Sequence, residues 1–249
     1  IHEKCVAGGI TGTILLAREG INGTVAGDPD TIDTLIAFLR AIPGCAELDV
    51  KYSHAKEMPF YRMKVRLKKE IVTLGVDGID PKREVGTYVR AEDWNALISD
   101  PDTVLIDTRN DYEYAIGTFK NAVNPKTNTF REFPEYVKTH FDPKKHKKVA
   151  MFCTGGIRCE KASAYMKYKG FKEVYQLEGG IIHYANKVKE QQLQNKFHGK
   201  NFVFDDRLGE RITDEIIAKC HQCDKPADTH TNCKNEGCHL LFIQCDECA

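Results

Sequence analysis

The chain has 249 residues, of which 41% are hydrophobic and 29% charged, and its 36 basic and 36 acidic side chains give a formal net charge of zero. This composition is typical of a globular protein with two or three domains, and it excludes an acidic disordered chain. No run approaches the roughly 18 apolar residues of a membrane span, and the average charge by itself argues against a strongly basic nucleic-acid binder.

Residues 1–80 are predicted to form a small ferredoxin-like α+β domain. The turn residues of Glu19-Gly-Ile-Asn-Gly23 between apolar runs indicate a β-hairpin, and an amphipathic helix follows. Because the chain starts at Ile1 rather than Met, we expect this domain to be truncated and to lack its first strand. The expected elements are a hairpin over 13–26, a helix capped by Asp30 and ended by Pro43-Gly44, and strands at 47–52 and 63–67.

Residues 81–197 alternate short apolar strands with helical segments, which is the pattern of a parallel sheet. In such sheets, function collects in the loops at the carboxyl ends of the strands, where Asp107 and Cys153 stand. Residues 198–249 are polar and cysteine-rich, and a segment this short needs a metal or a similar staple to fold. The strands expected in the middle domain are 103–107, 149–152 and 174–177, with a helix at 159–169.

The average charge conceals a division along the chain. Residues 1–80 carry 10 basic and 11 acidic side chains, residues 81–197 carry 20 and 15, and residues 198–249 carry 6 and 10. Lysine runs are usually solvated faces, but the excess in the middle domain also suits attraction of an anionic substrate toward its loops. The zero net charge therefore does not exclude an RNA substrate.

The most informative segment is Cys153-Thr-Gly-Gly-Ile-Arg-Cys-Glu-Lys161, which follows a buried strand and leads into a helix. Backbone N–H groups of such a loop form an anion-binding nest, and a helix N-terminus and an arginine both favour a thiolate. We therefore predict that Cys153 is a thiolate nucleophile with Arg158 beside it. Cysteine phosphatases use a longer Cys-x5-Arg loop to enclose a tetrahedral phosphate. The shorter Cys-x4-Arg loop suits a persulfide sulfur or an oxygen adduct, so phosphatase activity is disfavoured.

Further motifs accompany this loop in a fixed order. They are Glu19-Gly-Ile-Asn-Gly23, Asp107-Thr-Arg-Asn-Asp-Tyr-Glu113, Phe130-Arg-Glu-Phe-Pro134, Leu177-Glu-Gly-Gly180 and Phe202-Val-Phe-Asp-Asp-Arg207. Over essentially the whole chain, this set resembles the rhodanese-related tRNA uridine hydroxylases of bacteria, a branch of the rhodanese superfamily. The resemblance implies an α/β fold: a rhodanese parallel sheet with helices on both faces, preceded by the ferredoxin-like (acylphosphatase-like) domain and followed by a small cysteine-rich, zinc-type module.

The resemblance also implies an activity, the oxygen-dependent conversion of the wobble uridine of tRNA to 5-hydroxyuridine. Molecular oxygen is then the co-substrate and the anticodon region of tRNA the partner. The sequence itself shows no organic cofactor motif, and its composition argues against a membrane partner. Cys153 carries over as the essential cysteine, which either adds to C6 of the uracil or carries an activated oxygen; Arg158 and the loop amides stabilise the developing anion. The loop and its supports are expected to comprise Thr154, Gly155, Gly156, Ile157, Cys159, Asp107 and Arg109.

Several alternatives remain open from the residues. The loop alone equally permits a sulfurtransferase that works through a Cys153 persulfide, although the extended motif set favours the hydroxylase. A non-catalytic module is disfavoured because both Cys153 and Arg158 are retained. Cys159 is expected either to resolve a Cys153 adduct as a disulfide or to pack in the core. Glu113 is expected to pair with Arg109 or another loop group.

Six of the ten cysteines lie in the last thirty residues. Two Cys-x-x-Cys pairs with 21 residues between them are typical of a structural zinc site, and the pattern suits metal rather than disulfides. It favours a reducing compartment, and we expect a cytoplasmic protein. One or two zinc ions fit the pattern. The expected ligands are Cys220, Cys223, Cys245 and Cys248, with Cys233, Cys238, His221, His230 and His239 as further candidates.

Overall fold

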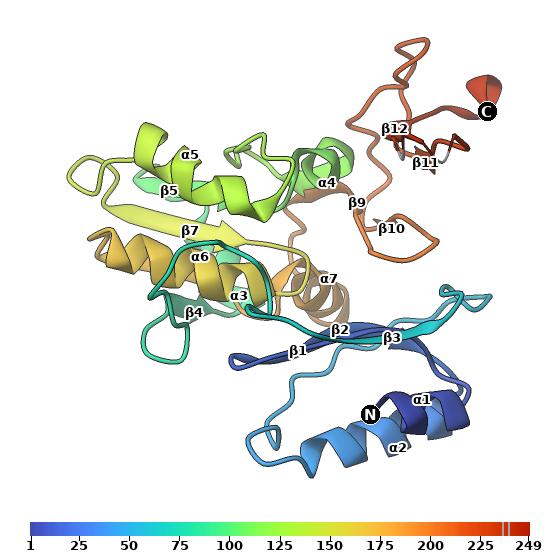
Figure 1. Cartoon of the computed structure of the whole chain (residues 1–249). Coiled ribbons are helices and arrows are strands. Elements are labelled where there is room, and N and C mark those ends of the chain that lie inside the picture. Colours follow the sequence, from blue (N-terminus) through green and yellow to red (C-terminus); the bar gives the residue numbers. More distant parts are fainter. Residues whose placement is uncertain (236, 239) are drawn as a thin grey trace. The chain divides into compact units, whose positions relative to one another are not determined.

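The computed structural model describes residues 1–235, 237–238 and 240–249, and its contacts divide the chain into two compact units (Figure 1). The first unit comprises Ile1–Thr73 together with Phe204–Arg207. The second comprises Leu74–Val203 together with Leu208–Ala249.

The first unit is a three-stranded sheet with two helices. Strand β1 is central, paired antiparallel with β2 and parallel with β3, and the hairpin, the long helix and the strand at 63–67 confirm the prediction. Asp28, rather than the expected Asp30, caps α2 by accepting the N–H of Asp30, and Leu35 and Leu39 of that helix pack with Cys5 in the core. The elements are α1 (His2–Ala7), β1 (Thr11–Ala17), β2 (Gly20–Ala26), α2 (Pro29–Arg40) and β3 (Met63–Leu67).

The predicted strand at 47–52 is wrong, because these residues form an irregular segment. Its backbone is satisfied locally: the N–H of Leu48 donates to the carbonyl of Cys45, and Arg40 donates to the carbonyl of Leu48. Asp49 also pairs with Lys51 two residues away, so this ion pair lies within the same segment.

The second unit is built on a four-stranded parallel sheet in the order β4-β8-β7-β5, which confirms the predicted sheet. The register places Asp107, the last residue of β5, opposite Phe152, the last residue of β7. The carboxyl ends of these strands therefore lie together. In Figure 1 the arrowhead of β7 points to the side where α4 (Asp111–Ile116) and α7 (Gly180–Gln191) lie. The strands are β4 (Thr87–Val89), β5 (Thr103–Asp107), β7 (Lys148–Phe152) and β8 (Glu173–Leu177).

Helices pack against this sheet, and α3 also packs against α7. Trp94, Phe119 and Tyr184 lie in the main core of the unit and are fully buried. In the residues that the structure describes, no helix is both long and apolar enough to cross a lipid bilayer. The helices are α3 (Ala91–Leu97), α4 (Asp111–Ile116), η1 (Phe130–Glu132), α5 (Phe133–His140), α6 (Ile157–Tyr168) and α7 (Gly180–Gln191).

The last fifty residues add two small sheets and a third core. β9 lies between β6 and β10, and β11 pairs with β12 as a hairpin. Ile116 and Phe202 pack with Cys220 and Ile243, so the cysteine-rich tail is joined to the end of α4. The elements are β6 (Gly117–Phe119), β9 (Phe197–Asn201), β10 (Glu210–Arg211), β11 (His230–Asn232), β12 (Leu241–Ile243) and η2 (Asp246–Cys248).

Candidate active site and cysteine cluster

The loop that joins β7 to α6 carries Cys153. β7 ends at Phe152 and α6 begins at Ile157, so residues 153–156 form the whole connection. Gly156 is the N-cap of the helix and has a φ of +96°, a left-handed backbone that glycine adopts without the clash of a side chain. The glycine pair therefore lets a buried strand turn directly into a helix.

The sulfur of Cys153 lies in an electropositive cradle. The residue is 0% exposed, and its Sγ accepts a hydrogen bond from the N–H of Gly156 at 3.1 Å. Burial by itself raises the pKa of this thiol. The hydrogen bond with the Cys159 thiol, the charge of Arg158 and the backbone N–H groups of both residues outweigh burial and lower the pKa to about 5. Cys153 is therefore a thiolate at neutral pH.

Arg158 is held by a buried carboxylate. Its Nη1 and Nη2 donate to the two oxygens of Glu113 at 2.6 and 2.7 Å, and Nη2 also donates to Thr154 Oγ1 at 3.3 Å. Burial raises the pKa of the Glu113 carboxyl, but the charge and hydrogen bonds of Arg158 hold it below its usual range. The sequence predicts that Glu113 pairs either with Arg109 or with another loop group. In the structure it pairs with Arg158 of the loop and not with Arg109.

Asp107 and Arg109 bind each other at the end of β5. Nε and Nη2 of Arg109 donate to the two carboxylate oxygens of Asp107 at 2.9 and 2.6 Å, and both side chains are fully buried. Thr118 Oγ1 donates to the same carboxylate at 3.0 Å, and Arg109 also donates to the carbonyl of Gly117. This network fixes the turn from which α4 presents Glu113 to the cysteine loop.

The start of α7 supports the cysteine loop from the other side. The N–H groups of Ile181 and Ile182 donate to the carbonyls of Cys153 and Thr154 at 3.0 and 3.1 Å. Gly180 has a φ of +66°, and a Cβ placed on it would lie 2.6 Å from the carbonyl oxygen of Cys153. The sequence offers only one signal for this role of Gly180, the glycine pair that follows β8. The contact itself could not be predicted, because it joins segments that are 27 residues apart.

Replacing Gly180 by alanine should displace the cysteine loop. The left-handed backbone costs about 1–2 kcal/mol with a side chain, and the forced shift of the neighbouring backbone adds about 1–3 kcal/mol. We expect a lower free energy of unfolding in urea and a loss of product formation. Gly155→Ala is the matched control for stability, because a Cβ there meets nothing within 4 Å. Equal stability of the two variants would contradict the assigned contact.

Cys159 lies beside Cys153 in the first turn of α6. It is also 0% exposed, and its Sγ lies 3.6 Å from Thr108 Oγ1. Burial and the hydrogen bond with the Cys153 sulfur raise the pKa of Cys159 well above its usual value. The two sulfurs therefore share one proton at neutral pH, with the thiolate on Cys153.

Four tail cysteines gather at one point, and they are the two Cys-x-x-Cys pairs predicted from the sequence. The sulfurs of Cys220, Cys223, Cys245 and Cys248 all lie within 4.8 Å of one another. Those of Cys223 and Cys245 are 3.6 Å apart, whereas a tetrahedral zinc with bonds of about 2.3 Å requires about 3.8 Å. The donor set and its spacing thus fit a metal ion.

The other candidate ligands lie elsewhere or outside the described residues. Cys233 and Cys238 are not part of the four-sulfur group. His230 is buried against the rings of Tyr112 and Phe202, and this burial lowers its pKa to about 4. His239 lies outside the residues that the structure describes.

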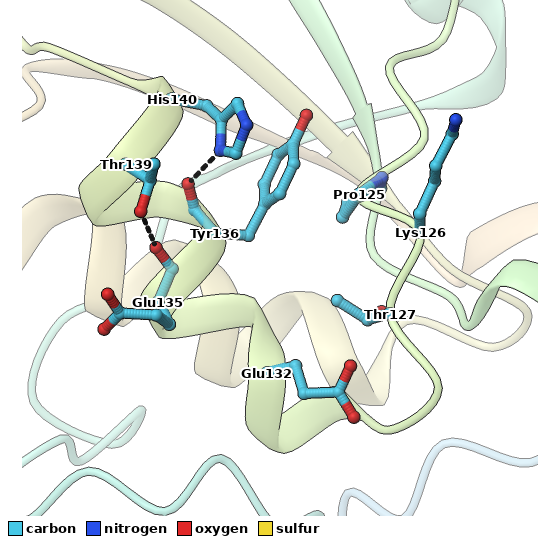
Figure 2. Close-up of a pocket in the computed structure, with 8 residues that line it drawn as sticks. All are labelled: Pro125, Lys126, Thr127, Glu132, Glu135, Tyr136, Thr139 and His140. Atoms are coloured by element: carbon cyan, nitrogen blue, oxygen red, sulfur yellow. Dashed lines mark hydrogen bonds between the residues drawn. The ribbon is translucent and has the colours of Figure 1, made fainter.

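A separate hollow of about 320 Å³ lies along α5 and contains none of the predicted site residues (Figure 2). It is lined in part by Lys126, Glu132 and Tyr136. Two of its polar groups bond within α5: His140 Nδ1 lies 3.0 Å from the carbonyl of Tyr136, and Thr139 donates to the carbonyl of Glu135. The hollow therefore supplies no alternative to the cysteine loop.

Comparisons with known proteins divide the chain among three family descriptions. Residues 1–71 match the UPF0176 acylphosphatase-like domain, residues 90–187 the rhodanese-like domain, and residues 198–249 the rhodanese C-terminal domain. Among solved structures, the rhodanese-like domain of an Anabaena protein covers 45% of this chain and 78% of its own, with 14% identity and a TM-score of 0.37. The expected rhodanese and acylphosphatase-like architecture is confirmed by the family matches.

Curated relatives match over most of the chain. A protein from Brucella ovis is 58% identical over 228 residues, which cover 91% of this chain and 74% of that protein, and it is named tRNA uridine(34) hydroxylase. A protein of the same name from Brucella suis is also 58% identical over 228 residues, covering 91% of this chain and 73% of its own. The chain therefore belongs to the tRNA uridine(34) hydroxylase family, as its ordered motifs predicted.

Proposed function

We propose that this protein hydroxylates C5 of the wobble uridine of tRNA, with molecular oxygen as co-substrate. One observation carries the proposal: a chain 58% identical to proteins named for this reaction holds a thiolate at Cys153 in a loop of hydrogen-bond donors. The name of the relatives favours hydroxylation over sulfur transfer, which the loop alone also permits.

Cys153 is the catalytic residue of this proposal. Its thiolate either adds to C6 of the uracil, which makes C5 nucleophilic, or reacts first with the oxidant. Arg158 and the N–H groups of Thr154, Gly155, Gly156 and Ile157 then stabilise the negative charge that develops beside the sulfur. Asp107, Arg109 and Cys159 act on the loop from neighbouring positions.

The substrate is the anticodon region of tRNA. The excess of 20 basic over 15 acidic side chains in residues 81–197 supports attraction of a polyanion to the domain that carries Cys153. In this proposal residues 1–80 position the RNA, residues 81–197 perform the reaction and residues 198–249 form the metal-stapled tail. A tRNA substrate and ten unpaired cysteines favour the cytoplasm.

The tail is proposed to hold one structural zinc ion on Cys220, Cys223, Cys245 and Cys248. Zinc binds four thiolates tetrahedrally and leaves no open position in such sites, so it supplies folding free energy rather than chemistry. The zinc ion stabilises the small core of the tail directly, because its ligand Cys220 is buried among the apolar residues of that core.

Metal analysis of the purified protein should find one zinc per chain. Cys220→Ser or Cys245→Ser should lose the ion and loosen the tail, which limited proteolysis would reveal. Cys233→Ser is the matched control, because its sulfur lies outside the four-sulfur group, and it should retain the zinc. Two zinc ions per chain, or loss of zinc in the control, would show that Cys233 and Cys238 also bind metal.

The reaction itself is tested with purified protein and unmodified tRNA transcript, incubated with dithiothreitol under air or under nitrogen. Nucleoside mass spectrometry should find 5-hydroxyuridine only under air. Product formed equally without oxygen excludes the hydroxylation as written. Transfer of sulfur from thiosulfate to cyanide, without any hydroxylated nucleoside, would establish the sulfurtransferase instead.

A further inference from the structure

The proposed hydroxylation gives no chemical step to Cys159, a buried thiol in the helix that begins directly after the catalytic loop. Cys159 is 0% exposed, and Gly156 joins it to the catalytic cysteine: the N–H of Gly156 donates to Cys153 Sγ at 3.1 Å, and its carbonyl accepts the N–H of Cys159 at 2.9 Å. Thr108 Oγ1 lies 3.6 Å from Cys159 Sγ and donates to the carbonyl of Phe152, the residue before Cys153. In the part of the chain that the structure describes, Cys5 and Cys45 lie in the first unit, four tail cysteines form their own group, and Cys233 and Cys238 lie elsewhere in the tail. Cys159 is thus placed to react with Cys153 directly.

We propose that Cys153 and Cys159 act as a dithiol that supplies the two electrons of the hydroxylation and ends each turnover as a disulfide. The inference rests on the proposed function, because it assigns the electron source of that same reaction. The reaction needs such a source, since one atom of O2 enters the base and the other must be reduced to water.

The balance closes with this pair alone. The C5–H bond of the uracil is replaced by a C5–O bond, and the second oxygen atom leaves as water. The Cys153 thiolate and the Cys159 thiol together lose two electrons as their S–S bond forms. Cys159 releases one proton to the water and solvent supplies the other. An external dithiol reductant then reopens the disulfide by thiol–disulfide exchange.

The surroundings of the pair suit this chemistry. The lowered pKa of Cys153 and the raised pKa of Cys159 provide a reactive thiolate and a proton donor in the same turn of the chain. Thr108 Oγ1, 3.6 Å from the sulfur of Cys159, offers that thiol a polar neighbour in an otherwise buried site.

The experiment is a single-turnover measurement on the full-length protein. The protein is reduced under nitrogen, freed of reductant, mixed with excess unmodified tRNA transcript and then exposed to air. We expect about one 5-hydroxyuridine per protein, and non-reducing peptide mapping should find Cys153 joined to Cys159 in the same amount. Added dithiothreitol should then allow many turnovers.

Two variants separate the dithiol from mere packing. Cys159→Ser should make no product without reductant and regain slow turnover with excess dithiothreitol, which takes the place of the missing thiol. Cys45→Ser, which removes a thiol in the first unit, should keep the full single turnover. The rescue by dithiothreitol also shows that Cys159→Ser is folded.

The outcomes distinguish this inference from the function on which it rests. If wild-type protein forms 5-hydroxyuridine with dithiothreitol but none without it, or forms it without a disulfide, the dithiol is overturned and the hydroxylase stands. An undiminished single turnover in Cys159→Ser has the same meaning. If wild-type protein forms no 5-hydroxyuridine under air even with dithiothreitol, the proposed function fails and this inference fails with it.

Discussion

Replacing Cys153 by serine should abolish 5-hydroxyuridine formation while leaving the protein folded. Serine is only slightly smaller than cysteine. Its hydroxyl oxygen can accept the hydrogen bond that the N–H of Gly156 donates to Cys153 Sγ at 3.1 Å. Its hydroxyl is not ionised at neutral pH, so the variant lacks the nucleophile that both chemical routes require. The measurement is nucleoside mass spectrometry of tRNA incubated with equal amounts of each protein.

The Cys153 thiolate also determines the direction in which activity and stability change with pH. The folded protein lowers the pKa of Cys153 from 9.0 to about 5, so activity should fall as pH drops through 5. Because the thiolate is favoured in the folded state, its contribution to stability is fully present above pH 9 and is lost as pH falls to 5. The difference in unfolding free energy between wild type and Cys153→Ser should therefore widen between pH 5 and pH 9.

A matched control keeps this result specific. Cys45→Ser changes a free cysteine of the first unit and should leave both product formation and the pH profile unchanged. Residual hydroxylation by Cys153→Ser above a few per cent would contradict the assignment of the nucleophile. If activity rises only near pH 9, the surroundings of Cys153 do not stabilise its thiolate.

The parts of the fold that the sequence predicts are those with local causes. The parallel strands are short apolar runs, and the cysteine loop follows from a strand, two glycines and a helix start within ten residues. The metal cluster was predictable because each Cys-x-x-Cys pair already places two sulfurs together. The failed strand at 47–52 shows the limit, because the residue types of a segment do not reveal that its backbone is satisfied locally.

The parts that the sequence could not predict depend on long-range pairing. Glu113 and Arg158 are 45 residues apart in the sequence. The turn that follows β5 offers other acidic and basic side chains as competing partners. The choice is decided by packing: Asp107 already occupies Arg109, which leaves the Glu113 carboxylate for the loop arginine. Likewise, only the folded sheet brings Gly180 to the carbonyl of Cys153.

The same pairing makes Glu113→Gln one of the most destabilising substitutions expected in this chain. The glutamine fits the space, but it removes the negative charge and turns an amide N–H₂ toward the guanidinium of Arg158. Removing one charge of a buried ion pair costs about 3–5 kcal/mol, a large part of the roughly 5–15 kcal/mol that holds a domain folded. Urea unfolding at pH 7 measures the loss. Glu135→Gln, which breaks the exposed pair with Lys138, is the surface control and should change little.

The double variant Glu113→Leu with Arg158→Met separates the structural role of this pair from its chemical one. Replacing a buried ion pair by apolar side chains of similar volume is often neutral or stabilising, so the double variant should recover most of the stability that Glu113→Gln loses. It should not recover activity, because the charge of Arg158 is one cause of the low Cys153 pKa. A double variant that is stable and fully active would show that Arg158 serves the fold alone, whereas a stable, inactive protein with a raised Cys153 pKa assigns its charge to the thiolate.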